Sequence, residues 1–162
     1  MQMDKKEAAR IYDLYFDSVY KVCFLYMRSH ADAQDMTQET FCQMLRRLTR
    51  YETDEKAKAW LIVTASNLCK NQLKKWWVKS RVSYDDNVME ESIEKGTDET
   101  GYSDVYRAVT GLDAKYAIPT YLYYYEGYKT GEIAKILHEK QSTIQTRLAK
   151  ARELLKLELD RE

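Results

Sequence analysis

The sequence has few of the residues that end helices. Among its 162 residues there are one proline and five glycines. A β-sandwich or β-barrel needs many turns, which glycine and proline usually supply, so this composition argues against such folds and favours helices. Hydrophobic residues make up 44% of the chain and charged residues 32%, as in folded globular proteins rather than disordered ones. The length suits one domain of common size or two small ones.

Long apolar runs and paired cysteines are lacking as well. No stretch approaches the roughly 18 apolar residues that cross a membrane, and the first residues contain no signal-peptide core. The cysteines are odd in number and far apart, at Cys23, Cys42 and Cys69. They predict neither a disulfide framework nor a zinc site, so we expect them to be buried and inert. The sequence therefore predicts a cytoplasmic protein with no metal, no cofactor and no segment inserted in a membrane.

The net charge is zero, because 26 basic residues balance 26 acidic ones, but the charges are unevenly distributed. Residues 1–82 carry 15 basic and 10 acidic residues, a net charge of +5. Residues 83–104 carry one lysine and eight acids, a net charge of −7, and residues 105–162 carry 10 basic and 8 acidic residues, a net charge of +2. Charge blocks of this kind often mark linkers. We therefore predict two domains joined by an acidic flexible linker at residues 83–104.

Residues 1–82, which we name the first lobe, predict three amphipathic helices. The first spans about residues 4–28 and repeats apolar residues at steps of three and four. The second follows Asp32 as its N-cap and ends near Arg50. The third spans about residues 56–77, after a polar segment. The positions expected to be buried are Ile11, Tyr15, Val19, Val22, Tyr26, Ala33, Thr37, Phe41, Met44, Leu48, Leu61, Ala65 and Leu68.

Residues 105–162, which we name the second lobe, begin with two short helices. The first ends before Gly111, and the next begins after Asp113 and runs to about Glu126. Pro119 lies inside that helix and should remove a hydrogen bond and bend it. Tyrosines at helical spacing there are expected in the core rather than in a cofactor site: Tyr121, Tyr123, Tyr124, Tyr125 and Tyr128.

The end of the chain predicts a helix-turn-helix. A short helix at residues 130–137 and a long helix from Gln141 or Ser142 flank a short turn. Ala134 is the small residue where the two helices cross, and Ile144 packs back under it. The long helix is expected to bury Ile144, Leu148, Ala151 and Leu155.

In a helix-turn-helix the second helix enters the major groove of DNA by its N-terminal residues. Here those residues offer hydroxyls, an amide that can read adenine and a guanidinium that can read guanine, followed by cations suited to phosphates. They are Gln141, Ser142, Thr143, Gln145, Thr146, Arg147, Lys150 and Arg152. The alternative is a plain helical hairpin with a solvated polar face. In the turn, His138 stands where a glycine is usual, and we expect it to adopt a positive φ at a cost of about 1 kcal/mol.

Several segments resemble one known family. Residues 35–41 (DMTQETF) are similar to the D-x-x-Q-E-x-F core of region 2 in bacterial sigma factors, and residues 60–67 (WLIVTASN) to their W-L-x-x-I-A-x-N segment. Residues 121–128, 132–137 and 142–152 are similar to region 4. In order, spacing and total length the chain resembles the extracytoplasmic-function (group IV) sigma factors, which keep only these two regions.

The resemblance implies an all-α protein that directs core RNA polymerase to specific promoters and helps to open them, with no chemistry of its own. Region 2, at residues 1–82, would bind the polymerase and the −10 element, and region 4, at residues 105–162, the −35 element. The implied partners are the bacterial core polymerase, through its β′ clamp helices and β flap, and promoter DNA. In this family an anti-sigma factor often clamps the two lobes. The linker at residues 83–104 would thread near the active-site channel or stay solvated.

A polar face of the second predicted helix lies opposite the stripe that contains Phe41. By itself such a face is usually just solvated. The resemblance implies that this face docks on the β′ clamp helices, and it therefore favours docking over a merely solvated face. The implied polymerase-binding residues are Asp35, Gln38, Glu39, Phe41 and Arg46.

The third predicted helix carries amide and cationic side chains at steps of three and four, which can hold phosphates and bind exposed base edges. This stripe consists of Asn67, Lys70, Asn71 and Lys74. The resemblance implies that it reads the −10 element together with the preceding loop at residues 51–59, and that a base flipped from the melting strand is captured there. Lys56 and Lys58 could meet the DNA backbone in that loop.

The first lobe also contains all three tryptophans. Trp60 is expected in the core rather than as a stacking platform. Of the adjacent Trp76 and Trp77, one should be buried and the other exposed. This end of the helix could stack on unpaired bases or pack on the lobe, and the sequence leaves both open.

Other classes of function explain less of the sequence. An enzyme is disfavoured, because there is no Ser-His-Asp arrangement, P-loop, G-x-G-x-x-G motif or metal-spaced cluster. A stand-alone helix-turn-helix regulator would account for the second lobe but not for residues 35–41 or 60–67. A protein-binding adaptor made only of helices is the third class.

Overall fold

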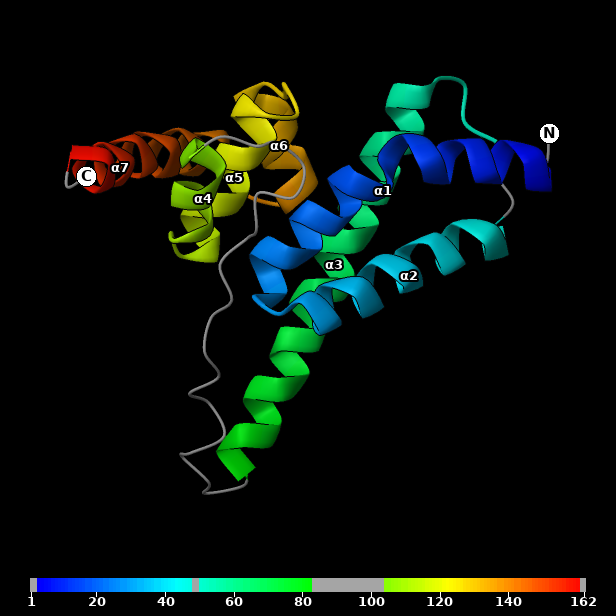
Figure 1. Cartoon of the computed structure of the whole chain (residues 1–162), viewed down its shortest axis with the longest axis horizontal. Coiled ribbons are helices and arrows are strands. Elements are labelled where there is room, and N and C mark those ends of the chain that lie inside the picture. Colours follow the sequence, from blue (N-terminus) through cyan, green and yellow to red (C-terminus); the bar gives the residue numbers. More distant parts are fainter. Residues whose placement is uncertain (1–2, 48–49, 83–103, 161–162) are drawn as a thin grey trace. The chain divides into compact units, whose positions relative to one another are not determined.

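The computed structural model describes residues 3–47, 50–82 and 104–160, and the chain divides into two compact units (Figure 1). In these ranges every regular element is a helix, which confirms the predicted all-α class. One unit contains the first lobe and the other the second lobe. Apart from Asp104, the predicted acidic linker lies outside the described residues, and so does Leu48. The domain boundaries at residues 82 and 105 therefore remain predictions.

The first lobe consists of α1 (Lys5–Met27), α2 (His30–Arg47) and α3 (Asp54–Val82). Helices α2 and α3 both pack against α1 and also against each other (Figure 1). The predicted apolar stripes meet in the core between them, although Tyr15 and Leu68 are only half-buried. The buried core side chains include Ile11, Val19, Val22, Phe24, Leu25, Phe41, Met44, Leu61 and Ala65.

Helix α1 is capped at both ends. At its start, Asp4 Oδ1 accepts a hydrogen bond of 2.8 Å from the backbone N–H of Glu7, as an N-cap should. At its end, Arg28 has a φ of 60° in the left-handed region, which costs a residue other than glycine about 1 kcal/mol. The Arg28 Nε donates to the carbonyl oxygen of Leu25 at 2.8 Å, so the side chain also stabilises this helix end.

The predicted bounds of α2 were partly wrong. The helix begins at His30 and not after Asp32, because Ser29 is the cap: its Oγ accepts from the Asp32 backbone N–H at 3.3 Å. An Asp at the third helical position is still favourable near the positive end of the helix dipole. The helix ends at Arg47, short of the predicted Arg50, which is not helical.

Helix α3 is longer than predicted at both ends. It begins at Asp54, and the backbone N–H of Lys56 donates to Thr53 Oγ1 at 3.2 Å. It continues to Val82, well past Cys69, the last buried residue among its described side chains, since the intervening sequence contains neither glycine nor proline. In Figure 1 this end of α3 extends past the part that packs on α1 and α2.

The cysteines do not share one environment. Cys23 and Cys69 are buried in the core, and their thiols are hydrogen-bonded to each other. That bond, together with burial, raises the pKa of the Cys69 thiol and makes it unreactive. Cys42 is exposed on α2, so the expectation of three buried cysteines is wrong at this position.

The second lobe consists of α4 (Asp104–Thr110), α5 (Ala114–Tyr124), α6 (Thr130–Leu137) and α7 (Gln141–Asp160). Helices α5 and α6 pack on α7, and α4 packs on α5 and α7. Helix α5 starts after Asp113 as predicted and continues through Pro119, but it stops before the predicted Glu126. The chain then turns at Gly127, whose φ is 75°. The core side chains of the lobe include Val109, Ala117, Ile118, Tyr121, Leu122, Ile133, Ile144, Leu148 and Ala151.

The tyrosines of α5 and the residues after it are less buried than predicted. Tyr121 is in the core, and Tyr125 and Tyr128 are half-buried. Tyr123 and Tyr124 are 39% and 52% exposed, so their assignment to the core is wrong. They lie at the C-terminal end of α5, and their rings contact each other edge to face, with centroids 4.9 Å apart. Leu155 on α7 is also only half-buried.

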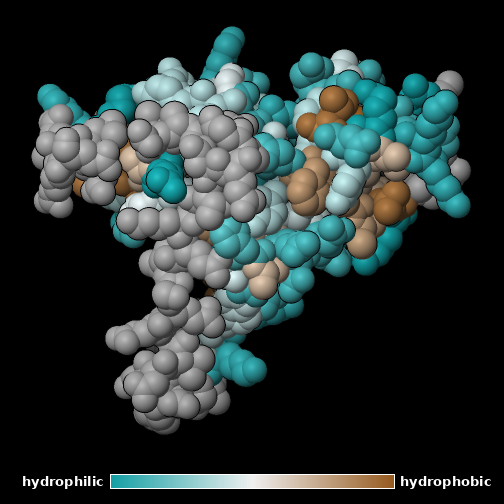
Figure 2. Space-filling view, in the orientation of Figure 1, coloured by the Kyte–Doolittle hydropathy of each residue, from teal (hydrophilic) through white to brown (hydrophobic). Residues whose placement is uncertain are grey.

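Where Figure 2 shows described residues, the surface is mostly hydrophilic, with several separate apolar patches. Among the described residues the large exposed apolar side chains are Leu14, Leu45, Trp77, Val78, Tyr123 and Tyr124. Within the described part of the chain, no helix is long and apolar enough to cross a membrane.

Candidate nucleic-acid and polymerase interfaces

The predicted helix-turn-helix is formed by α6 and α7, which pack against each other. Ala134 and Ile144 are both buried, as expected for the positions where the helices cross. Helix α7 begins at Gln141, which settles the alternative starts left open by the sequence. The Gln141 Nε2 donates to Thr130 Oγ1 at 2.9 Å and so ties the start of α7 to the start of α6; its role in reading DNA stays a prediction.

The turn is held mainly by backbone hydrogen bonds. His138 has a φ of 56°, which confirms the positive φ predicted from the sequence. The Glu139 backbone N–H donates to the carbonyl oxygen of Ala134 at 2.9 Å, so carbonyls that the helix end leaves open are satisfied. The Glu139 carboxylate in turn accepts from Arg147 Nη1 of α7 at 3.3 Å. Glu139 therefore links the turn to the recognition helix.

The outer face of α7 presents small polar side chains. Ser142, Gln145 and Thr146 are exposed and stand at i, i+3 and i+4, so they share one helix face. The Thr146 Oγ1 donates to the carbonyl oxygen of Ser142 at 2.9 Å. This bond uses the hydroxyl proton but leaves lone pairs that can accept from a base or a bridging water.

The predicted cations of α7 each have a partner in the lobe. Thr143 and Arg147 are half-buried beside the outer face, and Arg147 is paired with Glu139. Lys150 and Arg152 are exposed; Lys150 Nζ lies 3.8 Å from Glu153, and Arg152 Nη1 donates to the Tyr124 hydroxyl at 3.3 Å. Exposed contacts of this kind are weak enough to exchange for phosphate contacts.

The predicted stripe on α3 lies along the outer side of the helix. Asn71 and Lys74 are exposed, while Asn67 and Lys70 are half-buried. Val78, one turn further on, continues the same face, and it is 54% exposed. The polar stripe therefore ends in exposed apolar surface on the last turns of α3.

The tryptophans fit their predictions only in part. Trp77 is 54% exposed and Trp76 is half-buried, so the exposed member of that pair is confirmed. Trp60 is half-buried rather than in the core. The Arg47 guanidinium lies 5.2 Å from the centre of its ring, and the Tyr51 ring centroid lies 6.0 Å away. Partial burial raises the pKa of the Tyr51 hydroxyl above its usual value.

The two lysines predicted to meet the DNA backbone lie in the first turns of α3. Lys56 Nζ contacts Glu52 at 2.6 Å, and this hydrogen bond lowers the pKa of the Glu52 carboxyl. Lys58 is half-buried, with its Nζ 6.0 Å from the centre of the Tyr15 ring. Both cations have partners in the lobe, and Lys56 is the more accessible of the two.

The polar face predicted on α2 is accessible except at Phe41. Asp35, Gln38 and Arg46 are exposed, and Glu39 is half-buried and pairs with Arg46 at 3.1 Å. Phe41 is 3% exposed and packs edge to face on Tyr12 in the core. In this structure the buried ring supports the face from behind, and its role as a polymerase contact stays a prediction.

Sequence reasoning missed two features near these faces. Cys42 stands on α2 at steps of three, four and seven from Glu39, Gln38 and Asp35, and so lies within their exposed face. The second is a polar network between α1 and α3 around Arg10, whose partners stand 3 and 44 residues away. A contact over 44 residues leaves no periodic signal in the sequence.

Comparisons with known proteins match one region of a single protein family to each lobe. The family model for "Sigma-70 region 2" matches residues 11–78, and the one for "Sigma-70, region 4" matches residues 102–155. RNA polymerase sigma factor SigV of Bacillus subtilis (strain 168) is 30% identical over 148 residues, which cover 88% of this chain and 85% of that protein. ECF RNA polymerase sigma factor SigW of the same organism is 23% identical, over 96% of this chain and 90% of that protein.

The fold has a counterpart among solved structures. The sigma factor RpoE from Bartonella quintana, solved in complex with the anti-sigma factor NepR, aligns with a TM-score of 0.78 and 22% identity, over 96% of this chain and 98% of that one. Together the two matched regions and these relatives show that the chain belongs to the sigma-70 family, as an extracytoplasmic-function RNA polymerase sigma factor that directs the polymerase to promoters at transcription initiation.

Proposed function

We propose a division of labour between the lobes. The first lobe docks on core RNA polymerase and captures the −10 strand as the promoter opens, and the second lobe reads the duplex −35 element. The observation that carries this proposal is that the first lobe keeps two separate polar faces, on α2 and on α3, outside its apolar core. A stand-alone DNA-binding regulator would leave both faces unused.

The docking surface is the α2 face formed by Asp35, Gln38, Glu39 and Arg46. Its carboxylates are accessible, and Arg46 holds Glu39 at 3.1 Å, so the face presents charges of both signs. A mixed face of this kind gives orientation and specificity to a protein interface rather than bulk affinity. The partner that fits it is a complementary charged helix face of the polymerase, which the family assigns to the β′ clamp helices.

Strand capture is assigned to the α3 stripe of Asn67, Lys70, Asn71 and Lys74, with Lys56 and Lys58 on the approach to it. Amides can bond the edges of unstacked bases, and lysines can hold the backbone. Zero net charge gives the free protein little attraction to DNA. The stripe therefore acts after the polymerase has delivered the strand.

Duplex reading is assigned to the exposed face of α7. Gln145 can bond adenine with two hydrogen bonds, Ser142 and Thr146 add short contacts, and Lys150 and Arg152 meet phosphates. Thr143 and Arg147 lie beside this face, and Gln141 supports the start of the helix. The β flap of the polymerase is the proposed second contact of this lobe.

The remaining parts of the proposal concern setting and partners. The protein acts in the cytoplasm and catalyses no reaction. Because RpoE of Bartonella quintana was solved with the anti-sigma factor NepR, an anti-sigma factor is proposed as a partner of this chain as well. The acidic linker at residues 83–104 is proposed to follow the polymerase surface between the two sites.

The direct test combines the protein with bacterial core polymerase and a promoter library, and maps the 5′ ends of the transcripts. Specific transcripts with shared −35 and −10 sequences are expected. DNA binding without core polymerase and no transcripts would instead indicate a regulator, and an adaptor would bind no DNA.

Two sets of variants test the proposed roles of the two lobes separately. Asp35→Ala with Glu39→Ala should lower affinity for core polymerase by about tenfold or more, because charged groups at an interface lose their partners. Asp13→Ala, which removes an exposed carboxylate of α1 outside this face, is the matched control. If core affinity survived the double change, the docking face would be wrongly assigned.

In the second lobe, Gln145→Ala should reduce discrimination at one −35 position by about fivefold or more, since a paired amide contact is worth about 1–3 kcal/mol. Lys156→Ala, exposed further along α7, serves as the control. Arg147→Ala distinguishes two roles: a change at one base position means base reading, and an equal loss at all promoters means a phosphate or supporting contact.

A further inference from the structure

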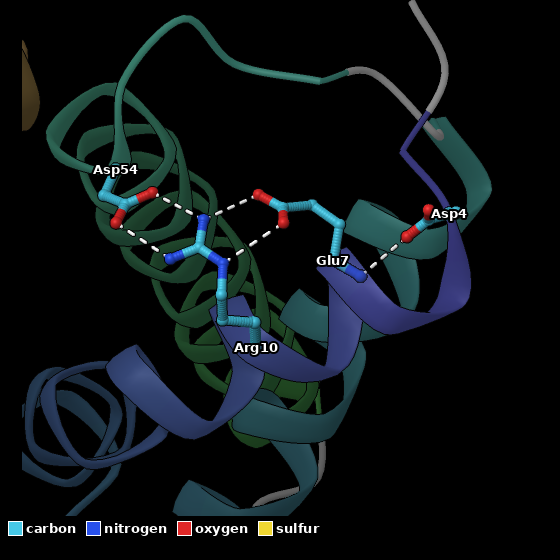
Figure 3. A network of polar contacts seen from close by, with 4 residues as sticks. All are labelled: Asp4, Glu7, Arg10 and Asp54. Atoms are coloured by element: carbon cyan, nitrogen blue, oxygen red, sulfur yellow. Dashed lines mark hydrogen bonds and ion pairs between the residues drawn. The ribbon is translucent and has the colours of Figure 1, made fainter.

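Arg10 joins the start of α1 to the start of α3 (Figure 3). We infer that Arg10 is a positioning residue for −10 recognition: its guanidinium fixes Asp54, and through Asp54 the loop and first turn of α3 that meet the captured strand. The inference rests on the proposed function, because it concerns how the proposed −10 site is held in place.

The guanidinium makes two hydrogen bonds with each of two carboxylates. Nη1 and Nη2 donate to the two oxygens of Asp54 at 3.0 and 2.8 Å, and Nε and Nη2 donate to those of Glu7 at 3.1 and 2.6 Å. Glu7 is itself fixed, because its backbone N–H donates to Asp4 Oδ1 at 2.8 Å. A planar guanidinium bonded to two carboxylates in this way sets their orientation as well as their distance.

The network holds the very residue at which α3 begins. Asp54 is the first residue of that helix, it directly follows the segment with Tyr51, and Lys56 stands two positions later. A carboxylate in the first turn also suits the positive end of the helix dipole. If Asp54 moved, the start of α3 would move with it, and the preceding loop and Lys56 would shift relative to the rest of the stripe.

The Arg10 network contributes little to the overall stability of the lobe. The side chains of Arg10 and Asp54 are 45% and 41% exposed, and exposed ion pairs add little to the free energy of folding. The packing of α1 on α3 is supplied instead by buried apolar residues such as Ile11 and Leu61. The bonds with Arg10 lower the pKa of both Glu7 and Asp54, so both carboxylates remain charged at neutral pH.

The network borders an open hollow of about 500 Å³ on the surface of the first lobe. Cations and acids line it together, and they include Lys6, Glu7, Arg10, Asp13 and Arg50. Such a surface allows a rival role for Arg10, as a simple phosphate contact. The two roles differ in what they do to sequence preference, because a phosphate contact weakens all sequences alike.

The experiment uses full-length protein bound to core polymerase. The probes are fluorescent single-stranded DNAs that carry the −10 element of a mapped promoter, and the same strands with one base replaced. The variants are Arg10→Ala, Arg10→Lys and Asp54→Asn. Asp13→Asn is the matched control, because it removes one negative charge beside the network and Asp13 takes no part in the bonds of Figure 3.

We expect Arg10→Ala and Asp54→Asn to lower the discrimination between cognate and replaced strands by about three- to tenfold, since shifts of about 1 Å have large effects in positioned sites. Arg10→Lys should fall between them and the wild type, because an ammonium cannot bond two carboxylates in the same plane. Affinity for core polymerase should stay within about twofold for every variant, and Asp13→Asn should discriminate like the wild type.

Two results would overturn the inference. The first is an equal loss of affinity for cognate and replaced strands, which indicates a phosphate contact. The second is unchanged discrimination in Asp54→Asn. If Arg10→Ala unfolds the first lobe, Arg10→Lys and Asp54→Asn decide the question. A wild-type complex with no preference for any −10 base would instead refute the proposed function of the lobe itself, whatever Arg10 does.

Discussion

The two lobes position their candidate sites in different ways. In the first lobe, α1, α2 and α3 are long, at 23, 18 and 29 residues, and a network across 44 residues of sequence ties α1 to α3. In the second lobe, α4, α5 and α6 are short, at 7, 11 and 8 residues, and all three pack on the recognition helix α7, whose first turns also make polar contacts with the turn just before them. The Glu139–Arg147 pair, for example, spans eight residues.

This difference indicates where each site is sensitive. A site held by long-range contacts depends on how whole helices pack, so it responds to changes far away in the sequence. A site held by a turn depends on a few local backbone angles and caps. We therefore expect substitutions in the first lobe to change how the polar face of α2 is positioned relative to the polar stripe of α3. Substitutions near residue 138 should change only the presentation of α7.

The largest expected effects come from removing core side chains. Leu61→Ala and Ile144→Ala each truncate a fully buried residue, one in each lobe, and each should destabilise its own lobe by about 2–5 kcal/mol. All three tryptophans lie in the first lobe, so tryptophan fluorescence reports its unfolding alone. In urea, Leu61→Ala should move the fluorescence midpoint, and Ile144→Ala should move a circular dichroism transition but not the fluorescence midpoint.

The comparison of lobes would fail if both variants moved both signals together. That result would mean that the lobes unfold as one cooperative unit. Val78→Ala, exposed at the far end of α3, is the control for a change in the first lobe that removes no buried contact.

A smaller effect is expected at the two left-handed residues that end helices, one in each lobe. His138→Gly should stabilise the second lobe by up to about 1 kcal/mol, because glycine adopts a φ of 56° without strain. Arg28→Gly should stabilise the first lobe less, since it also removes the Nε bond to Leu25. Urea midpoints from circular dichroism and from fluorescence measure the two effects. Equal gains in both lobes would show that the Arg28 side chain adds nothing.

The sequence predicted the elements well where burial is periodic. The stripes of α1 and α2 and the crossing of α6 and α7 were all found from apolar spacing. His138 could be predicted because a short turn between two helices leaves few backbone solutions, and one of them needs a positive φ. The same reasoning missed Arg28, because there the helix end could not be located as sharply from the sequence.

Errors arose where the pattern of apolar residues does not determine the answer. Periodicity predicts which face of a helix is buried but not where the helix ends. The predicted third helix therefore ended near residue 77, whereas α3 continues to Val82. Tyr123 and Tyr124 fit an apolar pattern, yet tyrosine also tolerates solvent, and both rings remain exposed. The Arg10 network could not be predicted, since two charged residues 44 positions apart have many other possible partners.

The pH dependence of the first lobe gives a weaker but specific signal. The pKa values of Glu7 and Asp54 are lowered in the folded lobe from their usual 4.5 and 3.8, first through hydrogen bonds from Arg10. Their contribution to stability is therefore present above those usual values, and it is lost as the pH falls through the lowered folded values. The difference in urea midpoint between wild type and Arg10→Ala should shrink between about pH 5 and pH 3.

Fluorescence is the measurement for this prediction too, because it isolates the first lobe. Asp13→Asn should keep the pH profile of the wild type. A difference between wild type and Arg10→Ala that stays constant down to pH 3 would show that the carboxylates do not contribute through Arg10.

The smallest perturbation uses the three cysteines, all of which lie in the first lobe. Cys23 and Cys69 are buried free thiols, while Cys42 lies among Asp35, Gln38 and Glu39 on the proposed docking face. A small thiol reagent should therefore modify one cysteine in the native protein and all three in urea. With core polymerase bound, the rate at Cys42 should fall by about tenfold or more, because a docked helix face excludes the reagent.

Cys42→Ser identifies the reactive thiol and should abolish the native reaction. Promoter DNA without polymerase should leave the rate at Cys42 unchanged, because the proposed strand-binding stripe lies on α3 and not on this face. If core polymerase bound without slowing the reaction, the first lobe would have to dock through another surface. The exposed apolar end of α3, with Trp77 and Val78, would then be the next surface to test.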